Sequence, residues 1–217
     1  DNLPEDRSIT HYLYGGDHEN RLKQELILGI GGIRALNEMG IVPELYHSNE
    51  GHSAFISLER IRRLIEEYHL TFDQAVETIR PSTLFTTHTP VPAGHDAFEE
   101  DLLRKYISHY HTRLNITWDQ LMDLGRCPGD ADRKFNMSFL ATYMSQELNG
   151  VSKLHGEVTQ GLFNKLWPGY LKEELYIGHV TNGVHYPTWI APEWQEVYRE
   201  LLGTANFDQT DRSLWEK

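Results

Sequence analysis

The sequence predicts an α/β fold with a largely parallel sheet and flanking helices. Short apolar runs, each the length of a strand, are separated by longer segments in which apolar residues recur with helical spacing. Strands that alternate with helices in this way are typical of βαβ units, whose strands lie parallel. The chain has 217 residues, of which 39% are hydrophobic, so it can bury the core of one large domain or two small ones.

The first helix is expected over residues 20–39, where apolar residues share one helical face. They are Leu22, Leu26, Ile30, Ile33 and Leu36. Gly29, Gly31 and Gly32 interrupt this segment, and each glycine costs a helix roughly 1 kcal/mol relative to alanine. We therefore expect a neighbouring backbone to approach the helix closely at these glycines, and Gly40 to end it.

The first two strands are expected at 42–48 and 83–88, where apolar residues are followed by polar clusters. Asn49 and Glu50 open the helix between them, whose apolar positions are Phe55, Leu58, Ile61, Leu64 and Ile65. Thr71 is expected to cap a second helix in this region, because its hydroxyl can accept a hydrogen bond from a free N–H of the first turn.

The second half of the chain is expected to supply two more strands. Asn136 is expected to cap a helix that runs to Leu148, and residues 151–154 are expected to end the third strand. His155 then lies where this strand passes into a helix. The fourth strand is expected at 175–182, where an apolar run precedes a polar cluster. Further helices are expected at 97–107, 117–124 and 193–202.

Composition excludes several classes of partner. The formal net charge is −12, whereas proteins that bind nucleic acids usually carry a basic face. Cys127 is the single cysteine, so no intramolecular disulfide can form, as expected in the cytoplasm. No apolar run approaches the ~20 residues that a membrane helix needs, and residues 1–10 lack the regions of a signal peptide. We therefore expect a cytoplasmic chain with neither nucleic acid nor a membrane as a partner.

Histidines gather at the predicted strand ends. Each strand is followed by or ends in a polar cluster, and these clusters are His47 to His52, Thr86 to Thr89, Lys153 to Gly156 and His179 to His185. The carboxyl ends of parallel strands meet at one edge of a sheet, where α/β folds bind their ligands. The sequence therefore predicts a ligand site at this edge, with the titratable imidazole of His155 at a strand-to-helix junction.

Three common catalytic motifs are missing from these clusters. His47 and His52 lie five residues apart and His88 and His95 lie seven apart, so loop hydrogen bonds are favoured over a helical zinc motif and we expect no metal. No G-x-S-x-G sequence marks a hydrolase nucleophile. The glycine-rich segment 29–34 lies within a helical pattern, so it indicates helix packing rather than a phosphate loop.

Asp17 has two interpretations. It follows Gly15 and Gly16 and precedes the first helix, and capping of that helix explains an aspartate at this position. A functional carboxylate on a mobile loop is the second interpretation. The two are compatible, because one carboxylate has two oxygens.

Five ordered segments closely resemble the α-glucan phosphorylase family of glycogen, starch and maltodextrin phosphorylases, especially its shorter bacterial branch. They are LYGGDHENRLKQELILGIGG, YHSNEGHSAFISLERIR, LFTTHTPVPAGHDAF, NMSFLATYMSQELNGVSKLHGEV and GHVTNGVHYPTW. These segments occur in the family's order and cover most of the chain. Five ordered motifs are far more specific than any one of them.

This resemblance implies the GT-B glycosyltransferase fold, in which two Rossmann-like domains face each other across a cleft. Residues 1–217 would form part of the N-terminal domain. The parent enzyme is then expected to use orthophosphate to cleave the terminal glucose from α-1,4-glucan, releasing α-glucose 1-phosphate with retention. The resemblance also implies pyridoxal 5′-phosphate as the cofactor, whose phosphate group assists proton transfer. A homodimeric parent is compatible with the resemblance.

The resemblance assigns a catalytic role to His155. It matches a family histidine at the glucose subsite, whose side chain lies near the 6-hydroxyl and whose carbonyl oxygen lies near C1. A carbonyl dipole at that position can stabilise the positive charge of an oxocarbenium-like transition state. His155 would therefore act through its backbone as much as through its ring.

Five further residues are implied to bind substrate. Asp17 matches the acidic residue of the family's mobile gate loop, and His18 takes the place of an asparagine that contacts glucose. His88 lies in a segment on the acceptor-glucan side. Asn182 and Gly183 match a TNG motif that shapes the cleft wall.

No segment of the chain matches the family's C-terminal domain, which carries the cofactor lysine and the residues that grip phosphate. The resemblance therefore implies a part of the parent that binds no pyridoxal phosphate and is inactive alone. Two alternatives stay open, a nucleotide-sugar-dependent glucan synthase of the same fold and a non-catalytic glucan-binding module. A cofactor lysine elsewhere in the parent would favour phosphorylase over synthase, and tight glucan binding by this chain alone would favour the module.

Overall fold

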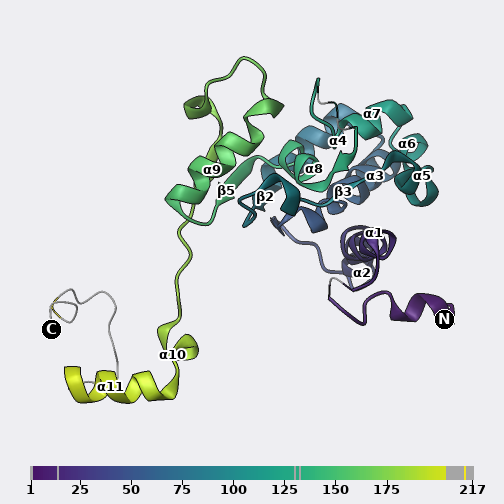
Figure 1. Ribbon diagram of the computed structural model, residues 1–217. Coiled ribbons are helices and arrows are strands. Elements are labelled where there is room, and N and C mark those ends of the chain that lie inside the picture. The colour runs from purple at the N-terminus through teal and green to yellow at the C-terminus, as the bar shows by residue number, and fades with distance from the viewer. Residues whose placement is uncertain (1, 14, 130, 132, 204–212, 214–217) are drawn as a thin grey trace. The chain divides into compact units, whose positions relative to one another are not determined.

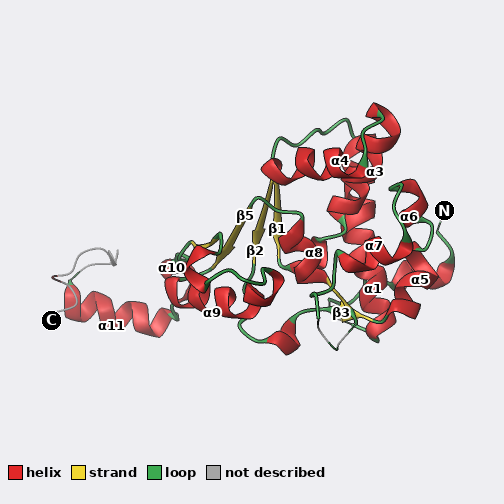
Figure 2. Ribbon diagram, turned by 90° about the horizontal axis from the view of Figure 1, so that it is seen from above, coloured by secondary structure: helices red, strands yellow, loops and turns green. Residues whose placement is uncertain are grey.

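A four-stranded parallel sheet with the order β1-β2-β5-β6 organises the first unit of the chain, residues 1–181 (Figures 1 and 2). Its strands are β1 Tyr46–Asn49, β2 Thr83–Thr86, β5 Glu147–Gly150 and β6 Ile177–His179. The register places Tyr46 opposite Thr83, Leu84 opposite Glu147, and Leu148 opposite Ile177. Because all three pairings are parallel, the predicted α/β class is confirmed.

The structure is a computed structural model that describes residues 2–13, 15–129, 131, 133–203 and 213. The α-helices of the first unit are α1 His18–Leu26, α2 Gly32–Glu38, α3 Ile56–Tyr68, α4 Phe72–Ile79, α5 Glu100–Ile107, α6 Tyr110–Arg113, α7 Trp118–Asp123, α8 Met137–Tyr143 and α9 Lys153–Phe163. Two short strands, β3 Ala97–Phe98 and β4 Phe135–Asn136, pair antiparallel. This pair was not predicted from the sequence.

The first predicted helix is present as α1 and α2, joined by a π-helical turn at Ile27–Gly31. The close approach is confirmed at Gly29, where an added Cβ would lie 2.7 Å from Cβ of Phe55. It is wrong for Gly31, where an added Cβ would meet only the side chain of Ile27 at 3.9 Å, and for Gly32, where it would meet nothing within 4 Å. Gly40 ends the segment with a φ of +69°, a left-handed conformation that favours glycine.

Side-chain caps fix three helix starts where the sequence predicts them. The hydroxyls of Thr71 and Thr117 accept hydrogen bonds from the backbone N–H groups of Gln74 and Gln120, at 3.3 and 3.2 Å. Each glutamine side chain returns a bond to the threonine N–H, which completes a capping box. Asn136 caps α8 in a similar way. These local interactions explain why α4, α7 and α8 begin as expected.

The third strand lies earlier than predicted. The expected helix through Leu148 is wrong, because α8 ends at Tyr143, five residues before that position, and residues 147–150 form β5. The expected strand end at 151–154 is also wrong, because Lys153 already begins α9. Strands β2 and β6 flank β5 on both sides, so tertiary pairing overrides the helical preference of its glutamate and leucine. A strand does pass into a helix here, but the junction lies at Val151 and Ser152, so His155 falls within the first turn of α9.

The core lies between the sheet and the helices that contact it. Helix α9 packs against β5 and β6, and Phe163 of this helix meets Phe85 of β2 with ring centroids 6.5 Å apart. Helix α3 contributes fully buried side chains, which are Leu58 and Ile61. This packing holds the strands rigidly and therefore fixes the loops at their carboxyl ends.

The second unit, residues 182–217, contains α10 Tyr186–Trp189 and α11 Pro192–Leu202. Helix α11 confirms the helix predicted at 193–202, and its Trp194 and Tyr198 rings have centroids 5.9 Å apart. Gly203 follows with a φ of +69°. Across the described residues, no helix combines the length and the apolar character needed to cross a membrane.

Candidate functional site

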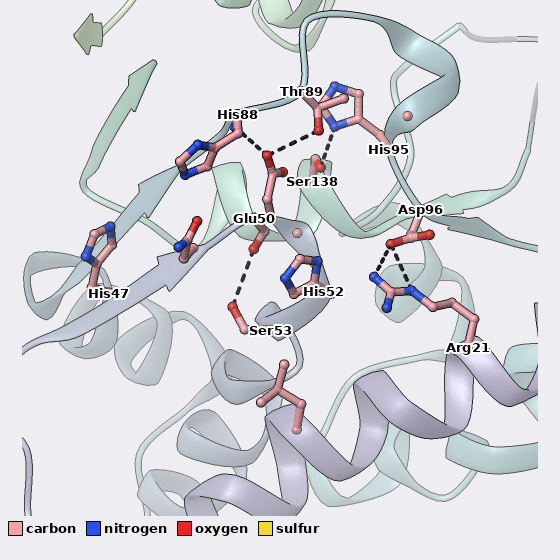
Figure 3. A pocket seen from close by; sticks show the side chains of 14 residues that line it. Arg21, His47, Glu50, His52, Ser53, His88, Thr89, His95, Asp96 and Ser138 are labelled. Carbon is pink, nitrogen blue, oxygen red and sulfur yellow. Dashed lines mark hydrogen bonds and ion pairs between the residues drawn. The ribbon is translucent and has the colours of Figure 1, made fainter. Parts of the chain in front are cut away.

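A cavity of about 830 Å³ opens at the carboxyl ends of β1 and β2 (Figure 3). Its lining consists mainly of polar side chains and is formed by Arg21, Leu28, His47, Asn49, Glu50, Gly51, His52, Ser53, His88, Thr89, Gly94, His95, Asp96 and Ser138. The predicted gathering of histidines at this edge is thereby confirmed for His47, His52 and His88. A cavity of this size is typical of ligand sites.

Glu50 ties the two strand ends together. Its backbone N–H donates to the carbonyl oxygen of Thr86 at 2.9 Å. One carboxylate oxygen accepts hydrogen bonds from the hydroxyl of Thr89 at 3.1 Å and from the backbone N–H of His88. Its φ of +67° is uncommon for a residue with a side chain, and such strain persists where the surroundings enforce it. We infer that Glu50 is held at the cavity by both loops.

Gly51 lets helix α8 approach the cavity. An added Cβ at Gly51 would lie 2.9 Å from the backbone nitrogen of Ser138. The Ser138 hydroxyl lies 2.7 Å from Nδ1 of His95, whose Nε2 is buried without a hydrogen-bond partner in the described structure. Burial lowers the pKa of His95, so its ring is neutral at pH 7.

Hydrogen bonds and burial set the state of two more histidines. The Thr86 hydroxyl donates to Oδ1 of Asn149 at 3.0 Å, so its oxygen accepts from Nε2 of His47 at 2.8 Å. This arrangement places a proton on Nε2 of His47. Burial, together with the nearby charge of Arg21, lowers the pKa of His52. His52 is therefore neutral at pH 7 and offers one donor and one acceptor.

Arg21 of α1 forms a charged wall with two carboxyl groups. Its Nη2 lies 2.8 Å from Oδ2 of Asp96, and its Nε lies 3.0 Å from Oε1 of Glu25. Burial, and then the neighbouring charge of Asp96, raise the pKa of Glu25 to about 9. Burial also tends to raise the pKa of Asp96. Hydrogen bonds with Arg21 and Glu25 outweigh burial, however, and lower the pKa of Asp96. At neutral pH the pair therefore carries one proton and one negative charge.

His155 lies in the first turn of α9, shortly after β5, and it does not belong to the cavity lining given above. Its Nδ1 accepts a hydrogen bond from the backbone N–H of Val151 at 3.2 Å, so its proton is on Nε2. Its carbonyl oxygen accepts a hydrogen bond from the hydroxyl of Thr159 at 2.7 Å. Gly150 makes room for the ring, because an added Cβ would lie 2.7 Å from Nδ1. His155 thus braces the turn between β5 and α9.

Asp17 and His18 anchor the start of α1. Oδ1 of Asp17 accepts from the backbone N–H of Asn20 at 2.8 Å, which confirms the capping interpretation. Nε2 of His18 lies 3.0 Å from the carbonyl oxygen of Ala97, and its ring centroid lies 4.8 Å from that of Phe98. Both side chains are exposed, and neither is among the residues that line the cavity.

Asn182 and Gly183 open the second unit and are both exposed. The cavity belongs to the first unit, so these two residues are described by themselves. An added Cβ at Gly183 would meet nothing within 4 Å. Packing alone therefore does not require glycine at this position.

Several cavity residues could not be predicted from the sequence, among them Arg21, Asp96 and Ser138. Arg21 lies in a predicted helix with Glu25 four residues on, which reads as an ordinary surface ion pair. Asp96 follows His95 directly, and that pairing was the one available signal. A search of the described side chains for three or more His, Cys, Asp or Glu residues able to hold a metal ion finds no such group.

Known proteins are similar to this chain over nearly all of its length. Residues 42–214 match the family model Phosphorylase, described as carbohydrate phosphorylase. Glycogen phosphorylase of Mycobacterium tuberculosis is 46% identical over 209 residues, which cover 91% of this chain and 24% of the relative. Maltodextrin phosphorylase of Thermococcus litoralis is 41% identical over 215 residues, covering 99% and 25%. Glycogen phosphorylase of Aquifex aeolicus is 34% identical over 218 residues, covering 100% and 31%. The chain thus spans between a quarter and a third of these relatives' length.

Proposed function

Because this chain belongs to the carbohydrate phosphorylase family, we propose that it supplies one wall of the glucan site of an α-glucan phosphorylase. In the parent, the bond between C1 of the terminal glucose and the glucan oxygen breaks, and a bond from C1 to orthophosphate forms. The glucan oxygen takes a proton, and α-glucose 1-phosphate leaves with retention. The observation that carries this proposal is the 830 Å³ cavity, where carboxylate, imidazole and amide groups converge.

The cavity offers the mixed donors and acceptors that sugar hydroxyls need. Neutral His52 presents one N–H donor and one ring acceptor. Glu50 presents a carboxylate that is fixed by the backbone N–H of His88. The side chain of His88 is exposed at the cavity, so we propose that it contacts the glucan. These groups bind and orient an uncharged sugar without a metal ion.

For His155 we propose a positioning role in this site. Its ring and its carbonyl oxygen are both engaged in holding the turn between β5 and α9. The stabilising carbonyl dipole implied by the resemblance is therefore directed along α9 toward Thr159. His155 acts on catalysis by fixing the turn that leads into α9 and thereby the wall of the site.

The parent is proposed to have the two-domain GT-B fold and to use pyridoxal 5′-phosphate, whose phosphate group supplies proton transfer when the cofactor is bound. The described residues that line the cavity include no lysine, so they offer no amine for the cofactor's Schiff base and do not fit its attachment. We propose that Asp17 and His18 act from the gate loop and that Asn182 and Gly183 act from the cleft wall.

The proposal predicts that the purified 217-residue chain does not catalyse the phosphorolysis of α-1,4-glucan. The chain is incubated with maltoheptaose and orthophosphate, and glucose 1-phosphate is measured with a coupled dehydrogenase assay. Release of glucose 1-phosphate by the chain alone would contradict the proposal. Calorimetric titration with maltoheptaose is the companion measurement, in which tight binding would favour a glucan-binding module over half of an active site.

A further inference from the structure

A second cavity, of about 350 Å³, opens at the amino ends of β1 and β2. It therefore lies at the opposite edge of the sheet from the candidate glucan site. Its lining includes Tyr46 at the start of β1, Ser82 just before β2, and two arginines of α3, Arg60 and Arg63. The proposed function makes no use of this cavity.

Arg60 is held in one orientation at this cavity. Its guanidinium carbon lies 3.7 Å from the centroid of the Tyr46 ring. Nη1 donates to the hydroxyl oxygen of Thr83 at 2.7 Å, and Nη2 donates to that of Ser82 at 2.6 Å. Both hydroxyls in turn donate to the carbonyl oxygen of Ile79, at 2.8 and 3.0 Å. The lone pairs of the two hydroxyl oxygens therefore face Arg60. These hydroxyls orient the guanidinium but do not neutralise its charge.

The charge of Arg60 is uncompensated. Among the described residues, no carboxylate forms an ion pair with Arg60, whereas Arg63 pairs with Glu67 at 2.8 Å. Burial lowers the pKa of Arg60 to about 10, so the side chain remains a cation at neutral pH while part of its hydration is lost. A guanidinium has five N–H donors, and the two hydroxyls use only two of them. Three charged side chains line the cavity, namely Arg60, Arg63 and Glu67. Arg63 and Glu67 pair with each other, so among the described residues the positive charge of Arg60 has no carboxylate partner.

The cavity rim is apolar. Val42 is 86% exposed and Tyr68 is 68% exposed, and both line the cavity. Exposed apolar side chains next to a fixed cation suit a ligand that has one charged end and one apolar end. The planar fork of arginine matches the oxygens of a phosphate or carboxylate group.

We propose that this cavity binds a small organic oxyanion, a phosphate monoester or a carboxylate, whose oxygens pair with Arg60 and whose apolar part packs against Val42 and Tyr68. The site is separate from the candidate glucan site and does not depend on the phosphorolysis proposed above. Since the whole chain carries a net charge of −12, an oxyanion is repelled elsewhere and binding relies on this local cation.

The test is a calorimetric titration of the full chain with phenyl phosphate, benzoate, inorganic phosphate and phenol. Phenyl phosphate or benzoate is expected to bind more tightly than inorganic phosphate, and phenol is expected not to bind. Arg60→Met is expected to weaken binding about tenfold or more. Arg104→Met is the matched control, because it removes the same charge from an exposed side chain outside the cavity and is expected to leave binding unchanged.

A second pair of variants covers the case in which Arg60→Met does not fold. Val42→Asp places a carboxylate at the rim, and Val42→Asn is its uncharged control; both act at an exposed position. Val42→Asp is expected to weaken binding at least about threefold relative to Val42→Asn, by repulsion of the oxyanion. Equal binding by these two variants, unchanged binding by a folded Arg60→Met, or no binding of either aromatic anion up to about 10 mM would overturn the proposal. Displacement of the anion by maltoheptaose would place it in the glucan site and would also overturn it.

Discussion

Two glutamates of similar burial are held in opposite protonation states. Glu25 of α1 is 1% exposed and Glu59 of α3 is 0% exposed. Burial raises the pKa of both, and in Glu25 nothing outweighs it, so the value is about 9. In Glu59, hydrogen bonds from Arg62, Arg34 and Tyr110 outweigh burial and lower the pKa to about 2.

The difference lies in how the partners are shared. Glu59 has two arginines and a phenol, with contacts of 2.7, 2.9 and 2.5 Å. Glu25 shares Arg21 with Asp96, which competes for the same cation at 2.8 Å. Around Glu59, every partner is hydrogen-bonded to the carboxylate, and this network supports the fold. Glu25 lies next to Arg21 of the candidate site and keeps its proton while buried. Perturbed carboxyl groups of the second kind are common at functional sites.

Breaking the satisfied network is expected to have the largest effect. Glu59→Ala leaves Arg62 and Arg34 without their shared carboxylate, and we expect a loss of about 3–5 kcal/mol in the free energy of unfolding. Urea denaturation at pH 7 measures this change. A loss below about 1 kcal/mol would show that the network contributes little.

Glu25→Gln is expected to stabilise the chain at alkaline pH. The pKa of Glu25 is about 9 in the folded chain and its ordinary value is 4.5, so the unfolded chain ionises first and the free energy of unfolding falls as pH rises from 4.5 to 9. The slope is at most about 1.4 kcal/mol per pH unit. Glutamine cannot ionise, so we expect a gain of about 2–3 kcal/mol at pH 8 and almost none near pH 4.5.

Urea melts at a series of pH values test this gain. Glu59 is expected to show the opposite pH dependence of stability. Because its pKa is about 2 in the folded chain, its stabilisation is present above pH 4.5 and is lost as pH falls toward 2. Equal stability of Glu25→Gln and the parent at both pH values would mean that folding does not raise the pKa of Glu25.

Tyr110→Phe is expected to have a smaller effect than either change above. It removes the hydrogen bond from the Tyr110 hydroxyl to Oε2 of Glu59 at 2.5 Å and the one that this hydroxyl accepts from Nη2 of Arg34 at 3.1 Å, while both arginines remain paired with Glu59. The expected loss is about 1–2 kcal/mol, typical of a hydrogen bond to a charged group. Tyr170→Phe, at an exposed tyrosine, is the control in the same thermal melts and should leave stability unchanged.

Glu67→Gln is expected to have the smallest effect. Glu67 pairs with Arg63 on the surface of α3, at 2.8 Å and with 46% of its side chain exposed. Solvent screens such pairs, so the change in unfolding free energy should stay within about 0.5 kcal/mol. A larger loss in urea denaturation would indicate that partner geometry matters more than burial in this helix.

The sequence predicted those elements whose signals are local. Thr71 and Thr117 mark helix starts through hydrogen bonds within one turn, and the segment with Ile61 shows its helical period directly. β5 was placed wrongly because glutamate, asparagine and glycine are poor strand residues, and only pairing with β2 and β6 makes them a strand. That pairing joins residues far apart in the chain.

The same contrast between local signals and long-range contacts applies to the residues of the candidate site. His47, His52 and His88 could be predicted because each lies within a strand of the parallel sheet or within three residues after its end. Arg21 and Ser138 reach the cavity from helices, and no local pattern distinguishes them from surface residues. The phosphorylase resemblance identified the family, but it could not show that His88 lines the cavity and that His155 does not.

Steady-state kinetics of two histidine variants in a full-length phosphorylase that carries this segment tests the proposed site most directly. His155→Asn keeps an acceptor near the position of Nδ1 for the Val151 N–H, so it should stay within about threefold of the parent in kcat/KM for maltoheptaose, whereas His155→Ala should lower kcat more than it raises KM. His88→Ala removes a side chain that lines the cavity and should lower kcat/KM by about tenfold or more. An inactive His155→Asn together with a fully active His88→Ala would contradict the account.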